Sequence, residues 1–484
     1  MTRSILLFST AILAACASSP ANLPGIDGDR GEIFAVAPDA PAEWAARDVV
    51  GIAPTGNWLT QFNDPIMVDL VQEALANSPT LESRAALVRA AKAATRTARS
   101  QRLPNVDASI SAGGTSNAFE TAGGIDRTTD SVYGLGVDAS WEADLWNRLG
   151  RGIAASEADL AASEADLAAA ELSVAAQTAI AWINLNAALA QENVALQTYE
   201  ARDRVRILTE RRFQRGLAQA LDVRTARSAL AGAEANIALT RQLSGEAARR
   251  LEILLGRYPA TEIEAPAELP VLDMLQPEVS PMLLLARRPD IAGAEARLVA
   301  AGLRAEQARL AMLPSLRLTG SLSTSQADFA DAIDPERIAA RLVASLVQPL
   351  FTGGRLSAQR DAAIAQAEAA IADYARAALS AWGEVEDALA ADALLADQED
   401  AQMRSLEEAR LAEDLAERQY TSGTITIFNL IDAQTRRLTA ESNLVSARAN
   451  RATNRISYHL ALGGGLPVSA AANANQTPQE DVAE

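Results

Sequence analysis

Side chains able to carry out enzyme chemistry are scarce in this chain of 484 residues. It contains one cysteine, Cys16, and one histidine, His459. A zinc site or a nucleophile–base pair needs several such groups close together. Glycine runs at 353–354 and 463–465 lack the lysine and hydroxyl residues of a phosphate-binding loop. The sequence therefore predicts no enzyme activity, no metal and no cofactor, and His459 is interpreted as a packing or surface residue.

The other ionisable residues are mainly acidic. Asp and Glu number 62 against 43 Lys and Arg, which gives a net charge of -19. Such a chain repels phosphate backbones, so nucleic acid is not an expected partner. Hydrophobic residues make up 49% and aromatic residues only 4%, a composition typical of long packed helices. The carboxylates recur at helical spacing, and we interpret them as solvated helix faces.

Cys16 ends a stretch that reads as a targeting signal. Arg3 is followed by an apolar run at 5–12 and by Leu13-Ala14-Ala15-Cys16, so residues 1–15 are predicted to be a signal peptide. The last four residues resemble a bacterial lipobox, which implies cleavage before Cys16 and a diacylglyceryl thioether on its sulfur, with palmitate among the acyl chains. The alternative is an ordinary signal peptide with a cysteine there by chance. Residues 16–56 are expected to form an extended segment leading from this anchor.

Two prolines mark a change of sequence period. Long helical patterns run into Pro104 and Pro314, and strict apolar–polar alternation follows each. We predict strands near 105–115, 131–142, 315–324 and 338–348, with a polar glycine-containing loop between the first two.

Very long helices are expected to fill most of the remaining chain. The pattern after Trp146 runs to about Arg212 without a proline, and such a helix would be on the order of 90 Å long. Within it the segment 172–191 has no charged residue and could be mistaken for a transmembrane helix. Its Gln, Thr and Asn residues favour a helix buried between neighbours.

The whole pattern occurs twice. We assign 57–256 to a first repeat and 281–465 to a second, joined by a connector at 257–280 and followed by a disordered tail at 466–484.

Four amphipathic strands of about 10 residues can each cross a bilayer but cannot close a membrane barrel, which needs at least eight strands. An open sheet edge is not tolerated in lipid. Several chains must therefore share one barrel, as a dimer or a trimer. Asp107, Asp138, Glu142 and Arg317 on the polar faces predict a wet lumen.

The chain resembles the outer membrane efflux protein family, and within it the lipidated, NodT-type branch that serves resistance-nodulation-division pumps. The resemblance covers roughly 58–465 and rests on motifs that occur in the family's order. These are Trp58 with Phe62 and Asp64-Pro65; Trp141 with Asp144-Leu145-Trp146; Arg288-Pro289-Asp290-Ile291 with Ala294-Glu295; Pro349-Leu350-Phe351 with Gly353-Gly354; Trp382 with Glu384-Val385; Tyr420 with Gly423; Leu430 with Asp432-Ala433-Gln434; and Ala461-Leu462-Gly463-Gly464-Gly465.

The resemblance implies a mainly α protein with membrane β structure. Three copies would form a twelve-stranded barrel in the outer membrane of a Gram-negative bacterium, continuous with a periplasmic helical barrel. The expected function is that of a passive exit duct for drugs or other small toxic compounds. The implied partners are a periplasmic adaptor protein and an inner-membrane pump of the resistance-nodulation-division type.

The resemblance also assigns roles to the turns that join the helices. Arg215, Gly216 and Leu217 in the first turn and Ser422, Gly423 and Thr424 in the second would contact the adaptor. Tyr420, Asp432, Gln434 and Arg436 are the candidates for a periplasmic gate. Asp432 and Arg436, four residues apart, could equally be a simple helix ion pair. Some relatives carry an acidic residue after the turn glycine, whereas this chain has Thr424-Ile425-Thr426-Ile427, so a carboxylate ring is not expected there.

Two other functions are compatible with parts of the pattern. An exit duct for type I protein secretion would use the same architecture, but the resemblance associates a lipidated Cys16 with the pump branch. A lipid-tethered periplasmic scaffold would have no use for amphipathic strands.

Overall fold

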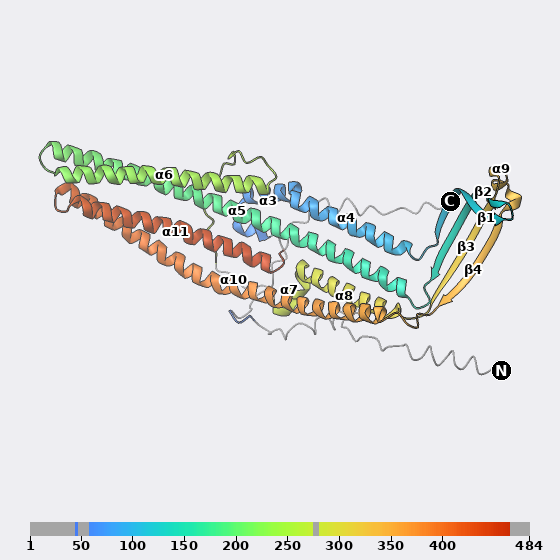
Figure 1. Cartoon of the computed structure of the whole chain (residues 1–484). Helices are drawn as coiled ribbons and strands as arrows, with labels where there is room; N and C mark the ends of the chain where they lie inside the picture. Colours follow the sequence, from blue (N-terminus) through green and yellow to red (C-terminus); the bar gives the residue numbers. More distant parts are fainter. Residues whose placement is uncertain (1–43, 47–57, 274–279, 465–484) are drawn as a thin grey trace, which may run out of the picture. The chain divides into compact units, whose positions relative to one another are not determined.

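The computed structural model describes residues 44–46, 58–273 and 280–464. The predicted signal peptide, Cys16, nearly all of the lead segment and the tail at 466–484 lie outside these residues. Figure 1 follows the order of the elements along the chain. The first half contains η1 (Trp58–Phe62), α3 (Pro65–Asn77), α4 (Pro79–Ser100), β1 (Asn105–Thr121), β2 (Gly124–Ala143), α5 (Arg148–Gln214) and α6 (Ala220–Leu254).

The second half repeats this order. It contains α7 (Pro281–Arg287), α8 (Pro289–Leu310), β3 (Ser315–Gln326), α9 (Phe329–Ala332), η2 (Pro335–Arg337), β4 (Ala339–Val347), α10 (Arg355–Ser422) and α11 (Ile427–Ala461). Helices α4 and α8 both have 22 residues, α5 and α10 have 67 and 68, and α6 and α11 both have 35. These matched lengths confirm the internal duplication.

The described chain forms two compact units. One contains 86–164 and 293–376, with the sheet and the helix segments next to it in sequence. The other contains 58–85, 165–273, 280–292 and 377–464, with the helical hairpins.

The first unit holds one antiparallel sheet in the order β1-β2-β3-β4. Residues directly opposite in register share a face. Ala108, Val137, Leu322 and Ala340 form one row across the strands, with apolar side chains throughout. The neighbouring row is polar and runs through Asp107, Asp138, Ser321 and Arg341. The sheet therefore has one apolar and one polar face, as the alternation predicts.

The predicted loop between the first two strands was wrong. Strands β1 and β2 continue as a paired hairpin to Thr121 and Gly124, with Ser116 opposite Thr129 and Asn117 opposite Thr128. Both faces of this extension are polar, so the sequence shows no apolar–polar alternation there. The backbone hydrogen bonds that pair the strands do not depend on such alternation. The segment between β3 and β4 also forms α9 and η2, which carry no clear sequence signal.

Backbone carbonyls near the two proline switches are satisfied by side chains from the strand ends. The indole of Trp141 donates to the Arg102 carbonyl at 2.8 Å, and that of Trp146 donates to the Pro314 carbonyl at 2.7 Å. Arg102 follows α4 and Pro314 precedes β3, so these bonds help to fix the turns in which each helix gives way to a strand. The predicted switches are confirmed.

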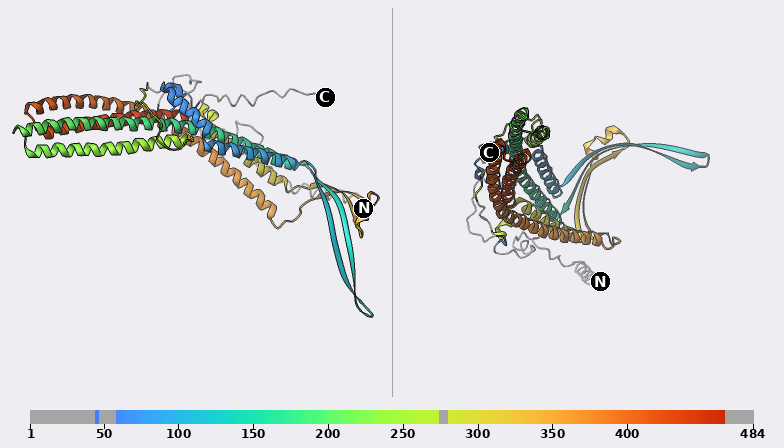
Figure 2. Two further views of the ribbon diagram at one scale, coloured as in Figure 1. Left: turned by 90° about the horizontal axis from the view of Figure 1, so that it is seen from above. Right: turned by 90° about the vertical axis from the view of Figure 1, so that its left-hand side faces the viewer.

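The second unit is built on two antiparallel hairpins, α5 with α6 and α10 with α11, which run side by side in Figures 1 and 2. Trp182 on α5 is fully buried in its largest apolar cluster. Its indole donates to Asp64 Oδ2 at 2.6 Å, while Asp64 Oδ1 accepts from the Met67 amide at 3.0 Å and caps α3.

By length and composition α5 is the one described helix that could cross a membrane, and 50% of its most apolar window is buried. Val174, Ile183 and Leu185 from the uncharged stretch lie in the protein core. This packing agrees with the interpretation of the stretch as a buried helix.

His459 is buried near the end of α11. Its ring stacks on Trp58 with centroids 5.8 Å apart, and Nε2 lies 3.0 Å from Gln61 Oε1. Burial, assisted by the charge of Arg455, lowers the pKa of His459 to about 4. The packing interpretation of His459 therefore fits its surroundings.

This lowered pKa predicts a pH-dependent stability. A folded pKa below the ordinary value of about 6.5 gives a stabilising contribution that is complete above that value and is lost as the pH falls toward 4. We expect His459→Gln to lower the melting temperature slightly at neutral pH. Between pH 6.5 and about 4.5, the free energy of unfolding should fall by about 2 kcal/mol less in this variant than in the wild type. Melting curves at both pH values measure this. An unchanged pH dependence in the variant would contradict it.

Candidate functional site

The first helix turn is a glycine-dependent reversal between α5 and α6. The Gly216 amide donates to the Phe213 carbonyl at 2.9 Å, and the Leu217 amide donates to the Arg212 carbonyl at 2.8 Å. Gly216 has φ +74°, the left-handed conformation that closes this type of helix end. Arg215, Gly216 and Leu217 are all exposed.

The second turn repeats the geometry between α10 and α11. The Gly423 amide donates to the Tyr420 carbonyl at 3.0 Å, and the Thr424 amide donates to the Gln419 carbonyl at 2.9 Å. Gly423 has φ +83°. Ser422 Oγ and Thr424 Oγ1 lie 2.8 Å apart, and Ser422, Gly423 and Thr424 are exposed. All six predicted docking residues are thus on the surface of the turns.

Arg212, the third-last residue of α5, joins the two turns. Its Nη1 donates to the carbonyls of Tyr420 at 2.7 Å and Thr421 at 3.0 Å, and its guanidinium lies 5.1 Å from the centre of the Tyr420 ring. A cation at the C-terminal end of α10 neutralises the helix dipole and satisfies unpaired carbonyls. The Tyr420 hydroxyl lies 2.7 Å from Thr209 Oγ1 in a buried contact. Helix α5 therefore holds the end of α10 through two of its side chains.

The two turn glycines form a matched pair for testing this link. A Cβ on Gly216 would meet no atom within 4 Å, whereas one on Gly423 would lie 3.3 Å from Arg212 Nη2. Gly216→Ala should cost about 1 kcal/mol through backbone strain alone. Gly423→Ala should cost more, since it also crowds Arg212, and thermal unfolding of both variants measures the difference. Equal losses would show that the Arg212 contact is unimportant.

The four gate candidates fall into two groups. Tyr420 is buried in a cluster with Val205, Ile427 and Leu430 beneath the turns. Gln434 is also buried, at 5% exposure. Asp432 and Arg436 are instead exposed and pair with each other at 2.8 Å along α11. Within this chain the structure brings Tyr420 together with its partners but gives Asp432 and Arg436 only the helix ion pair.

A second charged layer, not predicted from the sequence, lies next to this cluster. Arg202 on α5 donates from Nη2 to the Ile431 carbonyl at 3.3 Å and to Thr435 Oγ1 at 2.8 Å. Its Nη1 and the Oε1 of Gln434 are buried without a hydrogen-bond partner within the described residues. Burial lowers the pKa of Arg202, opposed by Glu413 and reinforced by Arg437.

Arg437 completes this layer. Its side chain is almost buried and forms ion pairs with Glu413 on α10 and Glu441 on α11. Arg410 also pairs with Glu441 at 2.8 Å. These residues could not be selected from the sequence, where each is one of many charges at helical spacing. The sequence places Arg202 and Arg212 on one predicted helix. It does not show which residues of the other hairpin they contact.

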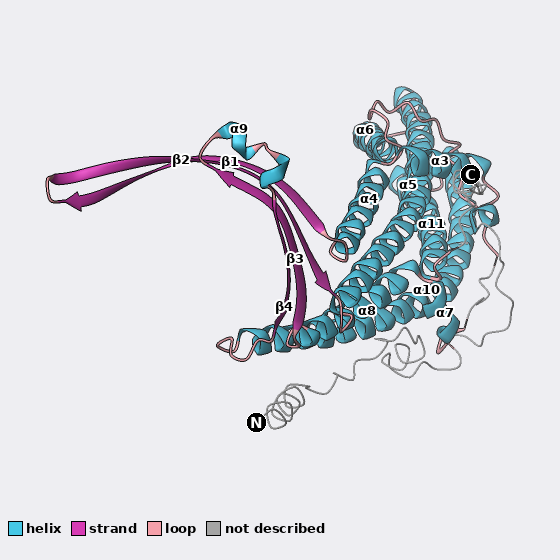
Figure 3. Ribbon diagram, turned by 90° about the vertical axis from the view of Figure 1, so that its right-hand side faces the viewer, coloured by secondary structure: helices cyan, strands magenta, loops and turns pink. Residues whose placement is uncertain are grey.

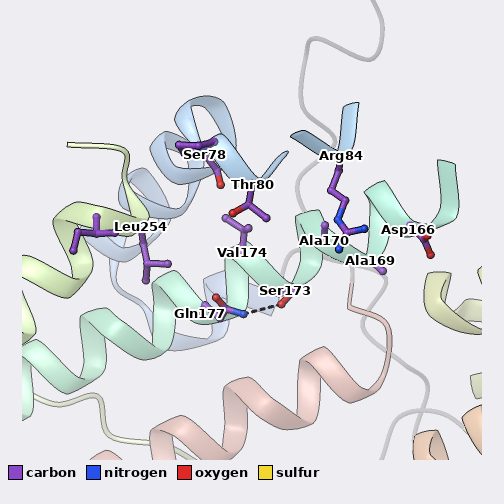
Figure 4. A pocket seen from close by; sticks show the side chains of 12 residues that line it. Ser78, Thr80, Arg84, Asp166, Ala169, Ala170, Ser173, Val174, Gln177 and Leu254 are labelled. Carbon is purple, nitrogen blue, oxygen red and sulfur yellow. Dashed lines mark hydrogen bonds between the residues drawn. The ribbon is translucent and has the colours of Figure 1, made fainter. Parts of the chain in front are cut away.

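Outside this region, a groove beside α5 offers little chemistry. It has a volume of about 630 Å³ and is lined by the start of α4, by α5 and by the end of α6 (Figure 4). Ala169, Ala170 and Val174 line its α5 side, and Gln177 donates to Ser173 at 2.9 Å. Among the described residues no group of three or more His, Cys, Asp or Glu side chains could hold a metal.

Comparison with known proteins identifies the chain. The profile of the family described as outer membrane efflux protein matches residues 70–257 and 281–464. The chain belongs to the outer membrane efflux protein family. It is 31% identical over 470 residues to the pyoverdine export outer membrane protein OpmQ of Pseudomonas aeruginosa, covering 95% of this chain and 96% of that protein.

Two further relatives agree. The chain is 27% identical to the cation efflux system protein CusC of Escherichia coli, covering 84% of this chain and 88% of that protein. The structure of the outer-membrane channel OprN superposes with a TM-score of 0.78 and 29% identity, covering 89% of this chain and 99% of that one. The predicted family, fold class, efflux function and outer-membrane location in a Gram-negative bacterium are confirmed. Members of this family are channel proteins rather than enzymes.

Proposed function

We propose that three copies of this efflux protein close one twelve-stranded barrel and serve as the passive exit duct of a tripartite pump. The observation that carries the proposal is the four-stranded sheet, with one apolar face and with β1 and β4 at its edges. Unpaired edges cost several kcal/mol per amide in lipid. Pairing β1 of one copy with β4 of the next removes every edge. The trimeric fold expected for the family supports three copies rather than two.

The two helix turns are the proposed periplasmic end of the duct. Exposed Arg215, Gly216 and Leu217, with Ser422, Gly423 and Thr424, would contact a periplasmic adaptor. Tyr420 and Gln434 are proposed gate residues, together with Arg212 and Arg202, which attach α5 to the second hairpin. Opening would move that hairpin away from α5 and break these bonds. Asp432 and Arg436 would contribute to the gate only if they gave up their ion pair with each other and contacted residues of another copy.

An inner-membrane pump of the resistance-nodulation-division type would supply the energy, and acylated Cys16 would add a second membrane attachment. The cargo is proposed to be drugs or other small toxic compounds. Relatives are named for pyoverdine export and for cation efflux, which fits a duct whose partner pump chooses the cargo. We propose no catalysis by this chain.

Deletion of the gene tests this function. We expect the deletion strain to become sensitive to several small toxic compounds while its secreted proteins are exported normally. Unchanged drug tolerance with a secreted protein retained inside the cell would favour type I secretion. If a Cys16→Ser variant expressed in the deletion strain restores drug tolerance fully, acylation is dispensable. The assignment as an exit duct would be unaffected by that result.

A further inference from the structure

The segment 327–338, which joins β3 to β4, lies against the sheet. Its helix α9 contacts β2 and β3 (Figure 3). Thr324 Oγ1 donates to the Ala332 carbonyl at 2.6 Å and accepts from the Leu135 amide at 3.3 Å. The Tyr133 and Phe329 rings meet edge to face with centroids 5.9 Å apart. The segment is therefore fixed to the sheet at two places.

The face it covers is the apolar one. Thr324 is opposite Leu135, and Leu135 is opposite Ile110, so all three share the face that carries Val137 and Leu322. Between this face and the segment lies a cavity of about 340 Å³. Its apolar lining includes Ile110, Leu135, Val137 and Leu322 from the sheet and Ile333 and Ile338 from the segment.

The segment itself is amphipathic. Phe329, Ile333 and Ile338 are each at least half exposed, at 57%, 55% and 50%. Its one arginine, Arg337, pairs with Asp331 at 2.9 Å and with Asp334 at 3.5 Å. Arg337 thus offsets only part of the negative charge of the segment, which also carries Asp328 and Glu336, while large apolar side chains remain uncovered.

The position of the segment along the barrel axis indicates what these exposed apolar side chains contact. Strands β3 and β4 pair from Ser315 to Ser323, close to the length that crosses a bilayer in a tilted barrel. The segment follows directly, at the end away from the proline switches. Aromatic residues such as Tyr133 and Phe329 are typical of the interface on the lipid side of a membrane barrel. The apolar face of the sheet is the surface that meets lipid.

We propose that residues 327–338 form a lipid strap, which lies on the outside of the barrel at its outer rim and holds one lipid acyl chain in the cavity beneath it. Ile110, Leu135, Val137 and Leu322 would contact the chain from the sheet side. The exposed parts of Phe329, Ile333 and Ile338 would contact the surrounding leaflet. The strap continues the lipid-contacting face of the barrel and forms no part of the proposed gate.

Spin labels test the position of the strap. The full-length protein, labelled at Ile333→Cys, is reconstituted in vesicles of dioleoyl phosphatidylethanolamine and phosphatidylglycerol. Leu342→Cys on the apolar face and Ser323→Cys on the polar face are matched controls. We expect the Ile333 label to be accessible to oxygen and protected several-fold from a water-soluble nickel complex, as at Leu342. Thr324→Val should increase the mobility of the Ile333 label.

An Ile333 label as accessible to nickel as that at Ser323 would overturn the strap while leaving the duct intact. A nickel-accessible label at Leu342 would contradict insertion of the barrel, and the strap with it. The two failures are thus distinguishable.

Native mass spectrometry tests the bound chain. Ala108→Leu adds three carbon atoms to the lining of the cavity and narrows it, whereas Ala344→Leu adds the same volume elsewhere on the apolar face. In gentle detergent we expect Ala108→Leu to retain one phospholipid fewer per chain than the wild type and Ala344→Leu. Equal retention by all three would contradict lipid binding in the cavity.

Discussion

Replacing Trp182 with alanine should abolish stable assembly of the protein. Trp182 is fully buried where α5 packs against the start of α3, and its indole donates to the carboxylate that caps α3. Loss of a buried tryptophan costs about 3–5 kcal/mol through lost burial and the cavity left behind. That is a large share of the stability of a typical domain. Melting temperature and the yield of oligomer from membranes measure the effect.

Trp182→Phe separates packing from the hydrogen bond. It keeps most of the ring but removes the donor to Asp64, so we expect a loss of about 1–2 kcal/mol and normal oligomers. Trp58→Phe, which removes no bond to Asp64, serves as a second aromatic control. A melting temperature for Trp182→Ala close to that of the wild type would show that this cluster does not hold the helices together.

Replacing Arg212 with alanine should favour the open state of the duct. Arg212 provides two hydrogen bonds to the end of α10 and lies over the ring of Tyr420. If the closed state loses about 1.4 kcal/mol relative to the open state, the open-to-closed ratio rises about tenfold. Single-channel recording in planar bilayers measures this ratio directly.

Arg211→Ala is the matched control, because it removes an exposed arginine one position earlier on α5. We expect its open probability to equal that of the wild type. Tyr420→Phe should have a smaller effect than Arg212→Ala, since it loses only the contact with Thr209. An open probability of Arg212→Ala equal to that of the wild type would contradict a role for this residue in closing the tip.

The features that could be predicted from the sequence are those encoded locally. Pro104 and Pro314 mark a change of period that any short window reveals, and the structure places a helix end and a strand start at each. The long helices were predictable because few prolines or glycines interrupt them. The exposed turn residues followed from glycines that end the helices, Gly216 and Gly423.

The remaining features depend on contacts between distant segments. The polar hairpin beyond Gly113 has no apolar face to reveal it, and only its backbone pairing defines it. Arg202 and Arg212 resemble other surface arginines until α5 meets the second hairpin. Tyr420 was a gate candidate, but its burial against Thr209 and Arg212 depends on α5 packing against α10.

Disulfide cross-linking between the sheet edges tests most directly whether copies of the chain share one barrel. A cysteine at Ser109 on β1 is combined in turn with one at Arg341, Val343 or Ser345 on β4, all on the polar face. The control pair, Asp107→Cys with Asp138→Cys, lies opposite within one chain. Each single-cysteine variant measures how much cross-linking arises from disulfides with Cys16.

We expect at least one edge pair to give covalent dimers and trimers in isolated outer membranes, with no larger product, while the control pair links only within the chain. If the control pair forms its disulfide but no edge pair links two copies, the sheet is not closed by neighbouring chains and the proposed shared barrel is wrong.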